Sequence, residues 1–390
     1  MTTTPDSPLR ILVLNLRDSL NPHAGGAEEH LHQLFSRIAA RGSQVTLHCG
    51  SFPGAKRDEV VDGIRVVRRG GRMDNAIWSA LFYLRHSAEF DVIADYTCQL
   101  HFLTPLYVRA PRVAVALHVV GDVYRHDLVF PVGHVMAAWE KFSLRYFYGR
   151  EHFIAISNST AAELLSHGIS SNRVRVIPGA PALPGPPPRI PEATDPTLVY
   201  HGRLKRYKGV DLLLRAMPEI LRRLPTAKLR IIGDGDDVGR LRRLATTLGL
   251  DDAVSFDGWL PADRHWMRLG SSWVHVQPSM KEGWSLSVLD AAQCGLPTLA
   301  SRVPSLEDMV EPGVTGELFS PDDVDDYVNK AVTLLQDSSL RRALGRRAAQ
   351  WVSRFTWDDA SRRVEVVLAE ITGREIREGI QAKPVSAGAE

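Results

Sequence analysis

The chain has 390 residues and a mass of 43.2 kDa, more than one hydrophobic core usually needs, so we expect two or three domains. Apolar residues make up 44% of the chain and charged residues 24%, which excludes a wholly disordered protein. The formal net charge of +2 gives no large basic surface, so we expect no nucleic-acid partner. Three widely spaced cysteines (Cys49, Cys98 and Cys294) exclude a disulfide framework and favour a reducing cytoplasm.

No targeting or membrane-spanning segment is evident in the sequence. Residues 1–10 are polar and lead into Ile11–Leu14, an apolar run that is too short for a signal peptide. Elsewhere no apolar stretch approaches the ~20 residues of a spanning helix. We expect a cytoplasmic protein that is soluble or at most peripheral to a membrane.

The first half of the chain alternates short apolar runs with longer amphipathic segments. The runs expected as strands are Arg10–Asn15, Val45–Cys49, Ile64–Arg68, Asp91–Ala94, Arg112–His118, His152–Ile156 and Val174–Ile177. The expected helices are Ala27–Arg41, Ala76–His86, His134–Tyr148 and Asn158–His167. This alternation predicts a parallel sheet covered by helices on both faces.

A proline-rich segment, Pro181–Pro191, interrupts this pattern and reads as a stiff linker. The alternation restarts with expected strands at Thr197–Tyr200, Lys228–Ile232, Ala253–Phe256, Trp273–Val276 and Pro297–Ala300. The helices expected there are Val210–Leu224, Val238–Leu248, Ser285–Cys294, Val324–Leu335, Leu340–Arg354 and Trp357–Ile371. We expect an α/β protein with domains at 1–180 and 197–356, a linker at 181–196 and a frayed tail at 379–390.

Ligands of open parallel sheets bind beyond the carboxyl ends of the strands, so we searched those junctions for chemistry. After the first strand, Gly25 and Gly26 precede a helix and would let backbone amides approach an anionic group. A glycine pair before a helix is more often a tight turn. The loop also lacks the glycine spacing of a dinucleotide site.

The second half carries a stronger group. Arg203 and Lys208 follow the first strand after the linker, and paired cations at a cleft suit a diphosphate, although an isolated basic loop is usually just solvated. Glu282 precedes a helix that begins near Ser285, whose amino end would present free backbone N–H groups to a ligand. The structural alternative makes Glu282 a charge partner of the helix and Asp290 a surface residue.

Four motifs then occur in order: Gly-Gly-Ala-Glu from Gly25, Gly-Arg-Leu-x-x-x-Lys-Gly from Gly202, Ile-Gly-Asp-Gly from Ile232 and Glu-Gly-Trp-Ser from Glu282. In this order and spacing they resemble the retaining nucleotide-sugar glycosyltransferases of family 4. The resemblance covers Ile11 to Ile371. It implies the GT-B fold: two Rossmann-like domains face each other across a cleft, and a terminal helix at 357–371 crosses back onto the first domain.

The resemblance also implies roles for individual residues. Arg203 and Lys208 would hold the donor's β-phosphate, and Glu282 would bind sugar hydroxyls. Asp290 stands where the family has a glutamate on the ribose, and residues 233–235 and 257–260 enclose the base. The implied catalytic residues are His118, Arg203, Lys208 and Glu282. The implied donor-binding residues are Gly25, Gly26, Gly233, Gly235, Gly258, Gly283, Trp284, Ser285, Leu286 and Asp290.

An Asp-Gly-Asp sequence at Asp234–Asp236 has the form that other transferases use to bind a divalent cation. Here it ends a strand in a glycine-rich turn, where aspartate is also expected for turn geometry. We interpret it as structural, and we expect neither a metal nor another cofactor.

The expected reaction is transfer of a sugar from a nucleoside-diphosphate donor (UDP or GDP) to a small-molecule, glycan or lipid-linked acceptor, with retention at the anomeric carbon. A nucleotide-sugar epimerase, a sugar phosphorylase and, less favoured, a non-catalytic binding module stay open, because one fold serves many functions. The aromatic and basic stretch His134–Arg150 suggests contact with an anionic membrane. We favour the alternative that its aromatics pack inside the domain.

Overall fold

The computed structural model describes residues 8–71, 73–97, 102–121, 123–127, 130–183, 185, 187, 190–321 and 323–374. Cys98, the tail at 379–390 and several positions of the predicted linker lie outside these residues. The chain divides into two compact units. The first unit takes residues 1–124, 134–179 and 356–390, and the second takes 125–133 and 180–355.

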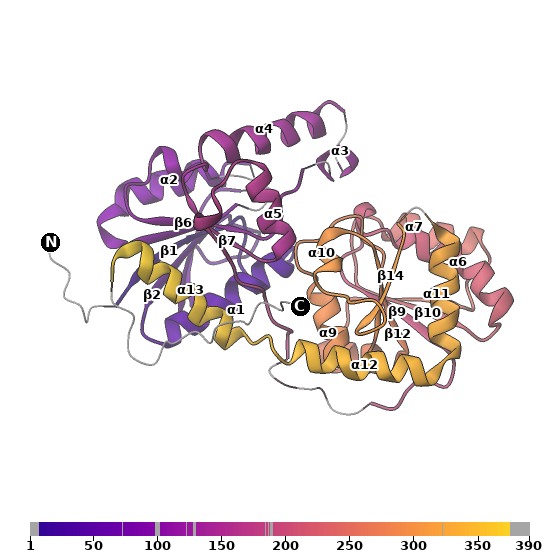
Figure 1. Cartoon of the computed structure of the whole chain (residues 1–390). Helices are drawn as coiled ribbons and strands as arrows, with labels where there is room; N and C mark the ends of the chain where they lie inside the picture. The colour runs from indigo at the N-terminus through magenta and orange to yellow at the C-terminus, as the bar shows by residue number, and fades with distance from the viewer. Residues whose placement is uncertain are drawn as a thin grey trace. The chain divides into compact units, whose positions relative to one another are not determined.

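The first unit contains an eight-stranded sheet in the order β3-β4-β2-β1-β5-β6-β7-β8 (Figure 1). Every neighbouring pair is parallel except β3–β4, which is antiparallel. The strands are β1 (Arg10–Leu14), β2 (Gln44–Cys49), β3 (Asp58–Val61), β4 (Ile64–Arg68), β5 (Val92–Tyr96), β6 (Arg112–Ala116), β7 (His152–Ala155) and β8 (Val174–Val176). Most of β1, β5, β6 and β7 is buried, as expected for strands covered on both faces.

Helices cover both faces of this sheet (Figure 1). The α-helices of the first unit are α1 (Gly26–Ala40), α2 (Asn75–His86), most of α4 (Val132–Tyr146), α5 (Asn158–Ser166) and α13 (Trp357–Thr372), and the division between the units falls within α3 (Val123–Asp127). Three short 3-10 helices lie at Ser87–Glu89, Thr104–Leu106 and Ser171–Arg173. The α2 and α4 helices lie on one face, while α1 and α13 pack together on the other.

The terminal helix α13 belongs to the first unit although it follows the second in sequence. Its N-cap is Thr356, whose side chain accepts a hydrogen bond from the Asp359 amide at 3.1 Å. The buried Trp357 ring lies 5.6 Å from the ring of His30 on α1. Arg41 Nε donates to Glu365 at 2.8 Å. The prediction that the last helix returns to the first domain is confirmed.

The second unit contains a six-stranded parallel sheet in the order β11-β10-β9-β12-β13-β14. Its strands are β9 (Thr197–His201), β10 (Lys228–Ile232), β11 (Val254–Gly258), β12 (Val274–Gln277), β13 (Thr298–Ser301) and β14 (Gly316–Phe319). Its helices are η4 (Arg206–Lys208), α6 (Val210–Arg223), α7 (Val238–Thr247), α8 (Ala262–Gly270), α9 (Leu286–Gln293), α10 (Pro304–Glu307), α11 (Val324–Gln336) and α12 (Ser338–Val352). Both units have the α/β architecture that the sequence predicts.

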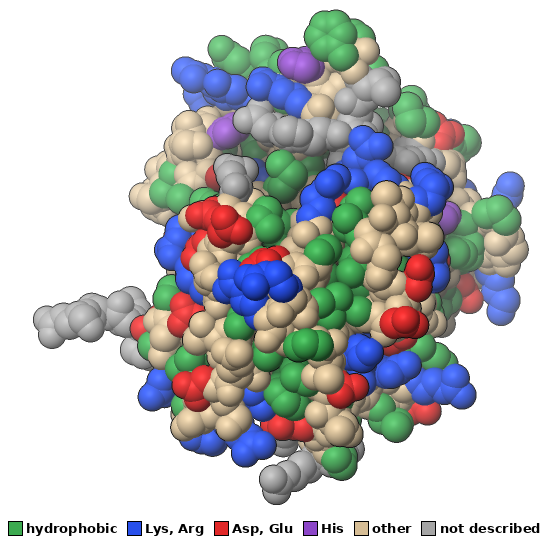
Figure 2. Space-filling model, turned by 90° about the vertical axis from the view of Figure 1, so that its right-hand side faces the viewer, with side chains coloured by type: hydrophobic (Ala, Val, Ile, Leu, Met, Phe, Trp, Pro, Cys, Tyr) green, Lys and Arg blue, Asp and Glu red, His purple; other side chains and the backbone are tan. Residues whose placement is uncertain are grey.

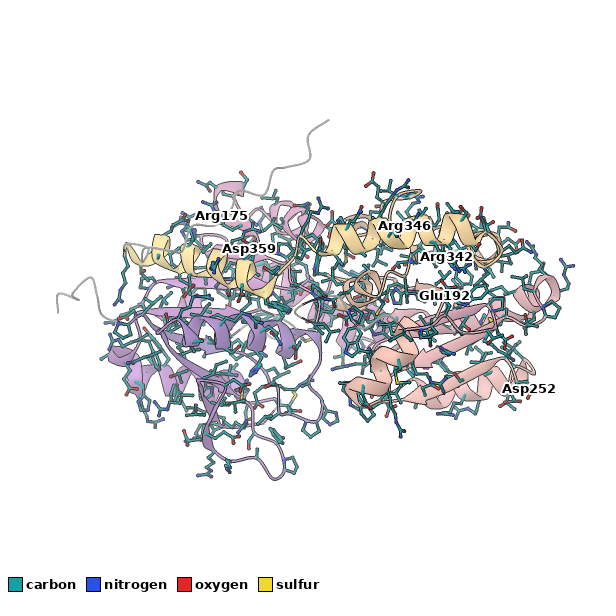
Figure 3. The ribbon with its side chains drawn as sticks, turned by 90° about the horizontal axis from the view of Figure 1, so that it is seen from below. Arg175, Glu192, Asp252, Arg342, Arg346 and Asp359 are labelled. Atoms are coloured by element: carbon teal, nitrogen blue, oxygen red, sulfur yellow. The ribbon has the colours of Figure 1, made fainter. Side chains whose placement is uncertain are left out.

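The described part of the linker is tied to the second unit. The Ala182 amide donates to Asp290 Oδ1 at 3.0 Å, and Gln293 Nε2 donates to the Leu183 carbonyl at 2.8 Å. Further along, Glu192 forms ion pairs of 3.5 Å with Arg341 and 3.3 Å with Arg342 on α12 (Figure 3). The segment is therefore held by side chains of the second unit as well as by its prolines.

Two sequence predictions need correction. The β6 strand ends at Ala116, so His118 lies two residues beyond it rather than at its end. The aromatic side chains of residues 134–150 do not all pack inside the domain. Tyr148 is fully buried, but Trp139, Phe142 and Tyr146 are 40%, 46% and 65% exposed. Their positions along α4 place them on the outward side of the helix.

The surface carries both signs of charge. On the face of the molecule in Figure 2, Lys and Arg side chains are interspersed with Asp and Glu side chains and with hydrophobic ones. This mixture agrees with the near-zero net charge. Among the described residues, no helix is both long enough and apolar enough to span a bilayer.

Candidate functional site

The candidate site lies in the second unit, at the carboxyl ends of its parallel strands. The loop after β9 carries Arg203 and Lys208, and the loop after β12 carries Glu282. Because β9 and β12 are hydrogen-bonded neighbours, these two loops leave the sheet side by side. This edge of a parallel sheet is where open α/β folds bind their ligands.

Lys208 and Glu282 form a direct ion pair. Lys208 Nζ donates to Glu282 Oε1 at 2.6 Å, and the two side chains are only 15% and 8% exposed. Gln277 Nε2 and Ser279 Oγ also donate to Glu282 Oε1, at 2.8 and 2.7 Å. The sequence places Lys208 and Glu282 in one site, but Gln277 and Ser279 were missed.

All of these hydrogen bonds use one carboxylate oxygen. Among the described residues, Glu282 Oε2 has no protein hydrogen-bond partner, and two of the three Lys208 ammonium protons are also unused. The pair therefore combines a fixed geometry with one free acceptor and two free donors. A ligand with an anionic group next to several hydroxyl groups would match them: the anion would accept from Lys208 and a hydroxyl would donate to Glu282.

A close approach of two loops brings the pair together. Gly209 follows Lys208 with a φ of +68°, and a Cβ atom there would lie 2.2 Å from the Pro278 carbonyl oxygen. The Met280 amide donates to the Tyr207 carbonyl at 2.8 Å, which joins the same two loops. Only glycine fits this position, because any side chain would push the loops apart. The Lys-Gly pair in the sequence was the signal for this contact.

The charge on Lys208 is stabilised by its surroundings. Burial lowers the pKa of the ammonium group, but the Glu282 carboxylate outweighs burial, so the pKa is raised above its ordinary value. Lys208 thus stays a cation at every physiological pH. A permanent cation of this kind can neutralise a phosphate group.

Arg203 lies five residues before Lys208 in the same loop and is half-buried. Its carbonyl accepts a hydrogen bond from the hydroxyl of the buried Tyr200 at 2.9 Å, which anchors the backbone. The loop after β10 packs beside it, where the Leu204 amide donates to the Asp234 carbonyl at 2.9 Å. The strand pairing therefore places the two cations and the glycine-rich turn at one edge of the sheet.

Gly233 and Gly235 allow this packing. A Cβ atom on Gly233 would lie 2.0 Å from the Gly202 carbonyl oxygen, and one on Gly235 would lie 2.2 Å from that of Leu204. Gly258, at the end of β11, has a φ of +67° that favours glycine. The segment between β11 and α8 borders an open depression of about 410 Å³. The depression is lined by Asp257, Leu260, Arg264, Met267 and Arg268.

The α9 helix starts one residue later than predicted, with Ser285 as its N-cap. Gly283 and Ser285 are buried, and the Ser285 amide donates to the Met309 sulfur at 3.2 Å. The Trp284 ring packs 5.5 Å from Phe355, and Leu286 joins the same apolar cluster. The Trp284 and Leu286 side chains thus pack against apolar neighbours, and the Ser285 amide already has a partner.

Asp290 is not the surface residue that the structural alternative expects. It is 8% exposed, and its Oδ1 accepts the Ala182 amide of the linker. The helical turn that carries it also includes Gln293, which donates to the Leu183 and Gly185 carbonyls. A described role of Asp290 is therefore to hold the linker.

The remaining candidates lie in the first unit. His118 is half-buried in the segment after β6. Gly25 is the N-cap of α1, and its amide donates to the Glu28 carboxylate at 2.7 Å, so a side chain already occupies this donor. Gly26 is the first residue of α1 and is exposed. Glu28, the last residue of the Gly-Gly-Ala-Glu motif, is buried and was given no role of its own from the sequence.

The Asp-Gly-Asp turn has partners in the protein. Asp234 Oδ1 accepts the Gly235 amide at 2.7 Å, and Asp236 pairs with Lys205. Within the described ranges, no group of three or more His, Cys, Asp or Glu side chains is arranged to hold a metal ion.

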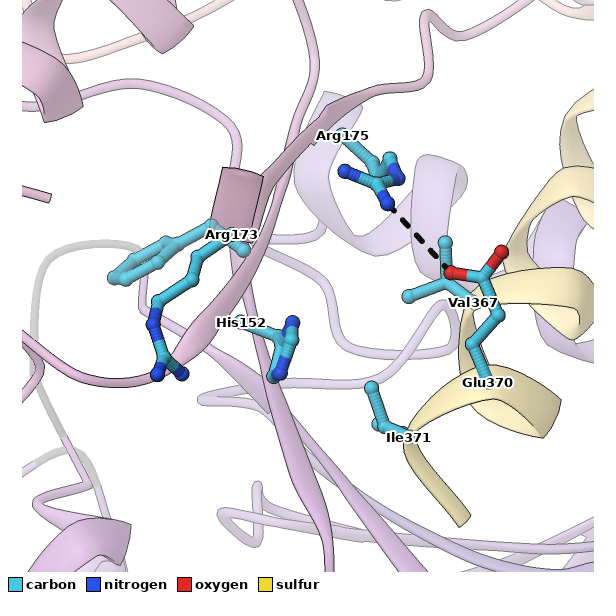
Figure 4. A pocket seen from close by; sticks show the side chains of 7 residues that line it. His152, Arg173, Arg175, Val367, Glu370 and Ile371 are labelled. Atoms are coloured by element: carbon cyan, nitrogen blue, oxygen red, sulfur yellow. Dashed lines mark ion pairs between the residues drawn. The ribbon is translucent and has the colours of Figure 1, made fainter. Parts of the chain in front are cut away.

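A second cavity, of about 90 Å³, lies in the first unit between β7, β8 and α13 (Figure 4). It is lined by His152, Phe153, Arg173, Arg175, Val367, Glu370 and Ile371. Burial and the neighbouring arginines lower the pKa of His152, and Arg175 pairs with Glu370 at 3.8 Å. Because His152 begins β7 and Arg173 precedes β8, this cavity opens at the amino ends of the strands, away from the edge that binds ligands.

Two family profiles match the chain, one in each half. Residues 24–180 match Glycosyltransferase Family 4, and residues 188–351 match Glycosyl transferases group 1. The chain belongs to the family 4 glycosyltransferases. A GDP-mannose-dependent alpha-(1-6)-phosphatidylinositol monomannoside mannosyltransferase of Mycolicibacterium smegmatis is 27% identical over 92% of this chain and 98% of its own. A D-inositol 3-phosphate glycosyltransferase of Acidothermus cellulolyticus is 35% identical over 42% of this chain and 38% of its own.

Solved structures confirm the fold of this family 4 member. HepE of Anabaena, in complex with UDP and glucose, has a TM-score of 0.74 at 17% identity and covers 93% of this chain and 100% of its own. Sucrose-phosphate synthase from Thermosynechococcus elongatus has a TM-score of 0.77 at 20% identity, with 94% and 100% covered. The GT-B fold predicted from the sequence is therefore confirmed.

Proposed function

We propose that this glycosyltransferase moves a sugar from a nucleoside-diphosphate donor to an acceptor hydroxyl, with retention at the anomeric carbon and without a metal ion. The observation that carries the proposal is the Lys208–Glu282 pair, which is buried, fixed by Gln277 and Ser279, and still has free donors and a free acceptor. A donor sugar offers one group for each: a diphosphate for Lys208 and hydroxyls for Glu282.

The other residues of the second unit take roles beside this pair. Arg203 is the second cation for the diphosphate. The turn at Gly233–Gly235 and the depression beside Gly258 would receive the nucleoside, whose base would lie near Leu260. The amino end of α9 directs its helix dipole toward negative charge. To bind the ribose as well, the Asp290 carboxylate would accept a ribose hydroxyl in addition to the Ala182 amide of the linker.

The reaction follows from this placement of charge. The bond between the anomeric carbon and the diphosphate oxygen breaks, and the electron pair leaves with the diphosphate, where Arg203 and Lys208 neutralise it. The acceptor oxygen attacks the anomeric carbon on the same face, and its proton passes to the departing phosphate oxygen. Among the described residues, Glu282 is the carboxylate bonded to Lys208, and in this proposal its free oxygen binds sugar hydroxyls, so the reaction is written without a covalent glycosyl intermediate.

Metal independence rests on the same charges. Two side-chain cations and a helix amino end supply the positive charge that a divalent ion supplies in other transferases. Asp236 is paired with Lys205 and Asp234 bonds within its own turn, which agrees with a structural role for both. Full activity in the presence of a chelator is expected. This part of the proposal would be contradicted if activity strictly required Mg²⁺ or Mn²⁺ and if Asp236→Asn abolished that metal-dependent activity.

A panel of nucleotide sugars tests the proposed function. GDP-mannose and a phosphatidylinositol-type lipid are the first donor and acceptor to try, because the mycobacterial relative is named for them. The measurements are nucleoside diphosphate release and the anomeric configuration of the product by NMR. We expect acceptor-dependent release and a retained configuration. Phosphate-dependent cleavage of a disaccharide would instead indicate a phosphorylase, and interconversion of the sugar alone an epimerase.

A further inference from the structure

The cavity between β7, β8 and α13 carries more positive than negative charge. In Figure 4 the sheet supplies His152 and Arg175, the short helix before β8 supplies Arg173, and α13 supplies Glu370. Its lining residues thus include two arginines and one glutamate. A local excess of positive charge in a concave site attracts anions.

Both guanidinium groups are held in place by backbone carbonyls. Arg173 Nη1 donates to the Arg150 carbonyl, and Arg175 Nη1 donates to the Asn172 carbonyl at 3.1 Å. An arginine side chain has five N–H donors, so most of the donors on both groups have no hydrogen-bond partner among the described residues. Because the two planar groups are already oriented, a ligand that accepts from them loses little of its binding energy to ordering them.

The negative charge in the cavity is held only loosely. Glu370 Oε2 lies 3.8 Å from Arg175 Nη2, which is longer than a hydrogen bond, and both side chains are 51% exposed. Exposed ion pairs of this kind are weak. Arg173 forms no ion pair with any residue that the structure describes. An anionic ligand can therefore replace Glu370 at Arg175 and provide the missing counter-charge for Arg173.

His152 adds a hydrogen-bonding group to the same cavity. Within the described part of the chain, its ring makes no hydrogen bond. Burial and Arg173 lower its pKa, with a smaller effect of Arg175 in the same direction, while Glu151 and Glu370 act against them. The imidazole is therefore neutral at physiological pH and offers one N–H donor.

We propose that this cavity binds a phosphate group, either as the free anion or as the monoester of a small molecule. A tetrahedral phosphate has enough oxygens to accept from both arginines and from His152, whereas a planar carboxylate is satisfied by one arginine. The apolar side chains of Phe153, Val367 and Ile371 complete the lining and contact the carbon part of a monoester.

The position of the cavity makes this ligand an effector rather than a substrate. The cavity opens at the amino ends of β7 and β8, while reacting ligands of open parallel sheets bind at the carboxyl ends. Its walls come from two strands and from α13, so a bound phosphate connects the terminal helix to the sheet of the first unit. The site is independent of the proposed donor site, which lies in the second unit.

Calorimetric titration of the full chain with inorganic phosphate and with glycerol 3-phosphate tests the site, with sodium chloride of equal ionic strength as the reference. Arg173→Gln and Arg175→Gln should each weaken binding about tenfold or more, because a charge-assisted hydrogen bond is lost. Glu370→Gln should strengthen binding about twofold to fivefold, because a competing carboxylate is removed. Tighter binding of glycerol 3-phosphate would identify a monoester as the ligand, and tighter binding of inorganic phosphate the free anion.

Matched controls change charges on α13 outside the cavity. Arg362→Gln removes one positive charge and Asp359→Asn one negative charge, and neither residue lines the cavity. Both variants should bind phosphate like the wild type. Lys208→Ala should also retain the binding, which separates this site from the proposed donor site. Phosphate should slow hydrogen exchange in β8 and in the last turns of α13.

Four results would overturn the proposal. The first is that neither phosphate compound binds, and the second is that Arg173→Gln and Arg175→Gln bind as tightly as the wild type. The third is an equal loss of affinity in the two α13 controls, which would indicate a general effect of charge. The fourth is that Lys208→Ala abolishes binding, which would place the phosphate in the donor site instead.

Discussion

At the residue scale, the site depends on a buried ion pair that keeps unused hydrogen-bonding groups. Lys208 Nζ lies 2.6 Å from Glu282 Oε1, and Gln277 and Ser279 donate to the same carboxylate oxygen. Buried pairs of this kind contribute little net stability but are costly to break singly. The position of this pair at the ligand-binding edge of the sheet is therefore better explained by function than by folding.

Glu282→Gln separates the two roles of the pair. The substitution removes the negative charge that holds Lys208, so the ammonium group becomes more available to a diphosphate. We expect turnover to fall strongly while the affinity for free UDP or GDP stays the same or rises. Isothermal titration calorimetry measures the affinity. A large loss of nucleotide affinity would instead indicate that Glu282 contributes to diphosphate binding or to folding.

Several buried histidines make stability sensitive to acid. Burial lowers the pKa of His30 to about 3 and of His48 to about 4, and burial with the neighbouring His265 lowers that of His201 to about 3. These groups are neutral when folded but protonate below about 6.5 when unfolded. Stability is therefore complete above pH 6.5 and falls as the pH drops towards 4, by about 1.4 kcal/mol per unit for each imidazole.

Thermal unfolding at pH 7.5 and pH 5 measures this loss. The midpoint should drop markedly at pH 5, and His30→Phe should reduce the drop, whereas His23→Gln at an exposed position should not. Asp95 acts in the opposite direction. Burial raises its pKa to about 6, so its contribution is present at low pH and is lost as the pH rises from 3.8 through 6. A midpoint unchanged between the two pH values would contradict the account.

At the scale of elements, the close approach of two loops determines where the donor site forms. Gly235→Ala would place a methyl group 2.2 Å from the Leu204 carbonyl oxygen. The two loops would separate, so we expect nucleotide affinity to fall at least tenfold. Gly239→Ala on α7 is the matched control, since its nearest neighbour is a flexible arginine end at 3.6 Å. Normal nucleotide binding by Gly235→Ala would show that the packing of these loops is not needed.

The terminal helix α13 stabilises the first unit by packing on α1. Trp357 is 5% exposed and contacts His30, so Trp357→Ala should cost about 3–5 kcal/mol. Hydrogen exchange should then increase in α1 and leave α12 of the second unit unchanged. Trp259→Ala, at a position 85% exposed, is the control and should not alter unfolding. Faster exchange confined to the second unit would contradict this packing.

Most of the periodic elements were predictable from the sequence, although the α8 helix and the β14 strand were not predicted. Strands such as Ile64–Arg68 and Lys228–Ile232 have the predicted bounds, because buried parallel strands are short apolar runs. The β3 strand was missed because it is a four-residue edge containing Asp58 and Glu59. The roles of Gln277, Ser279 and Asp290 were missed because their partners lie in other loops or in the linker. Pattern analysis reports periodicity within a segment and not contacts between segments.

At the scale of the whole molecule, both halves of the chain match the same family of enzymes, and the second unit carries the cations and the carboxylate that suit a nucleotide sugar. The central claim is that Arg203 and Lys208 bind the diphosphate of the donor. It predicts that nucleotide affinity and turnover fall together when either cation is removed, with a loss of 10²–10³ in kcat for Lys208→Ala, the order found for the loss of one transition-state donor.

Titration of UDP and GDP into the wild type, Arg203→Ala, Lys208→Ala and Lys228→Ala is the most direct test. Lys228 begins β10 at the opposite end of the same sheet, so its loss removes an equal charge away from the site. We expect one nucleotide to bind the wild type and Lys228→Ala equally well, and to bind the other two variants at least tenfold more weakly. Equal affinity in all four folded proteins would contradict the assignment of the donor site.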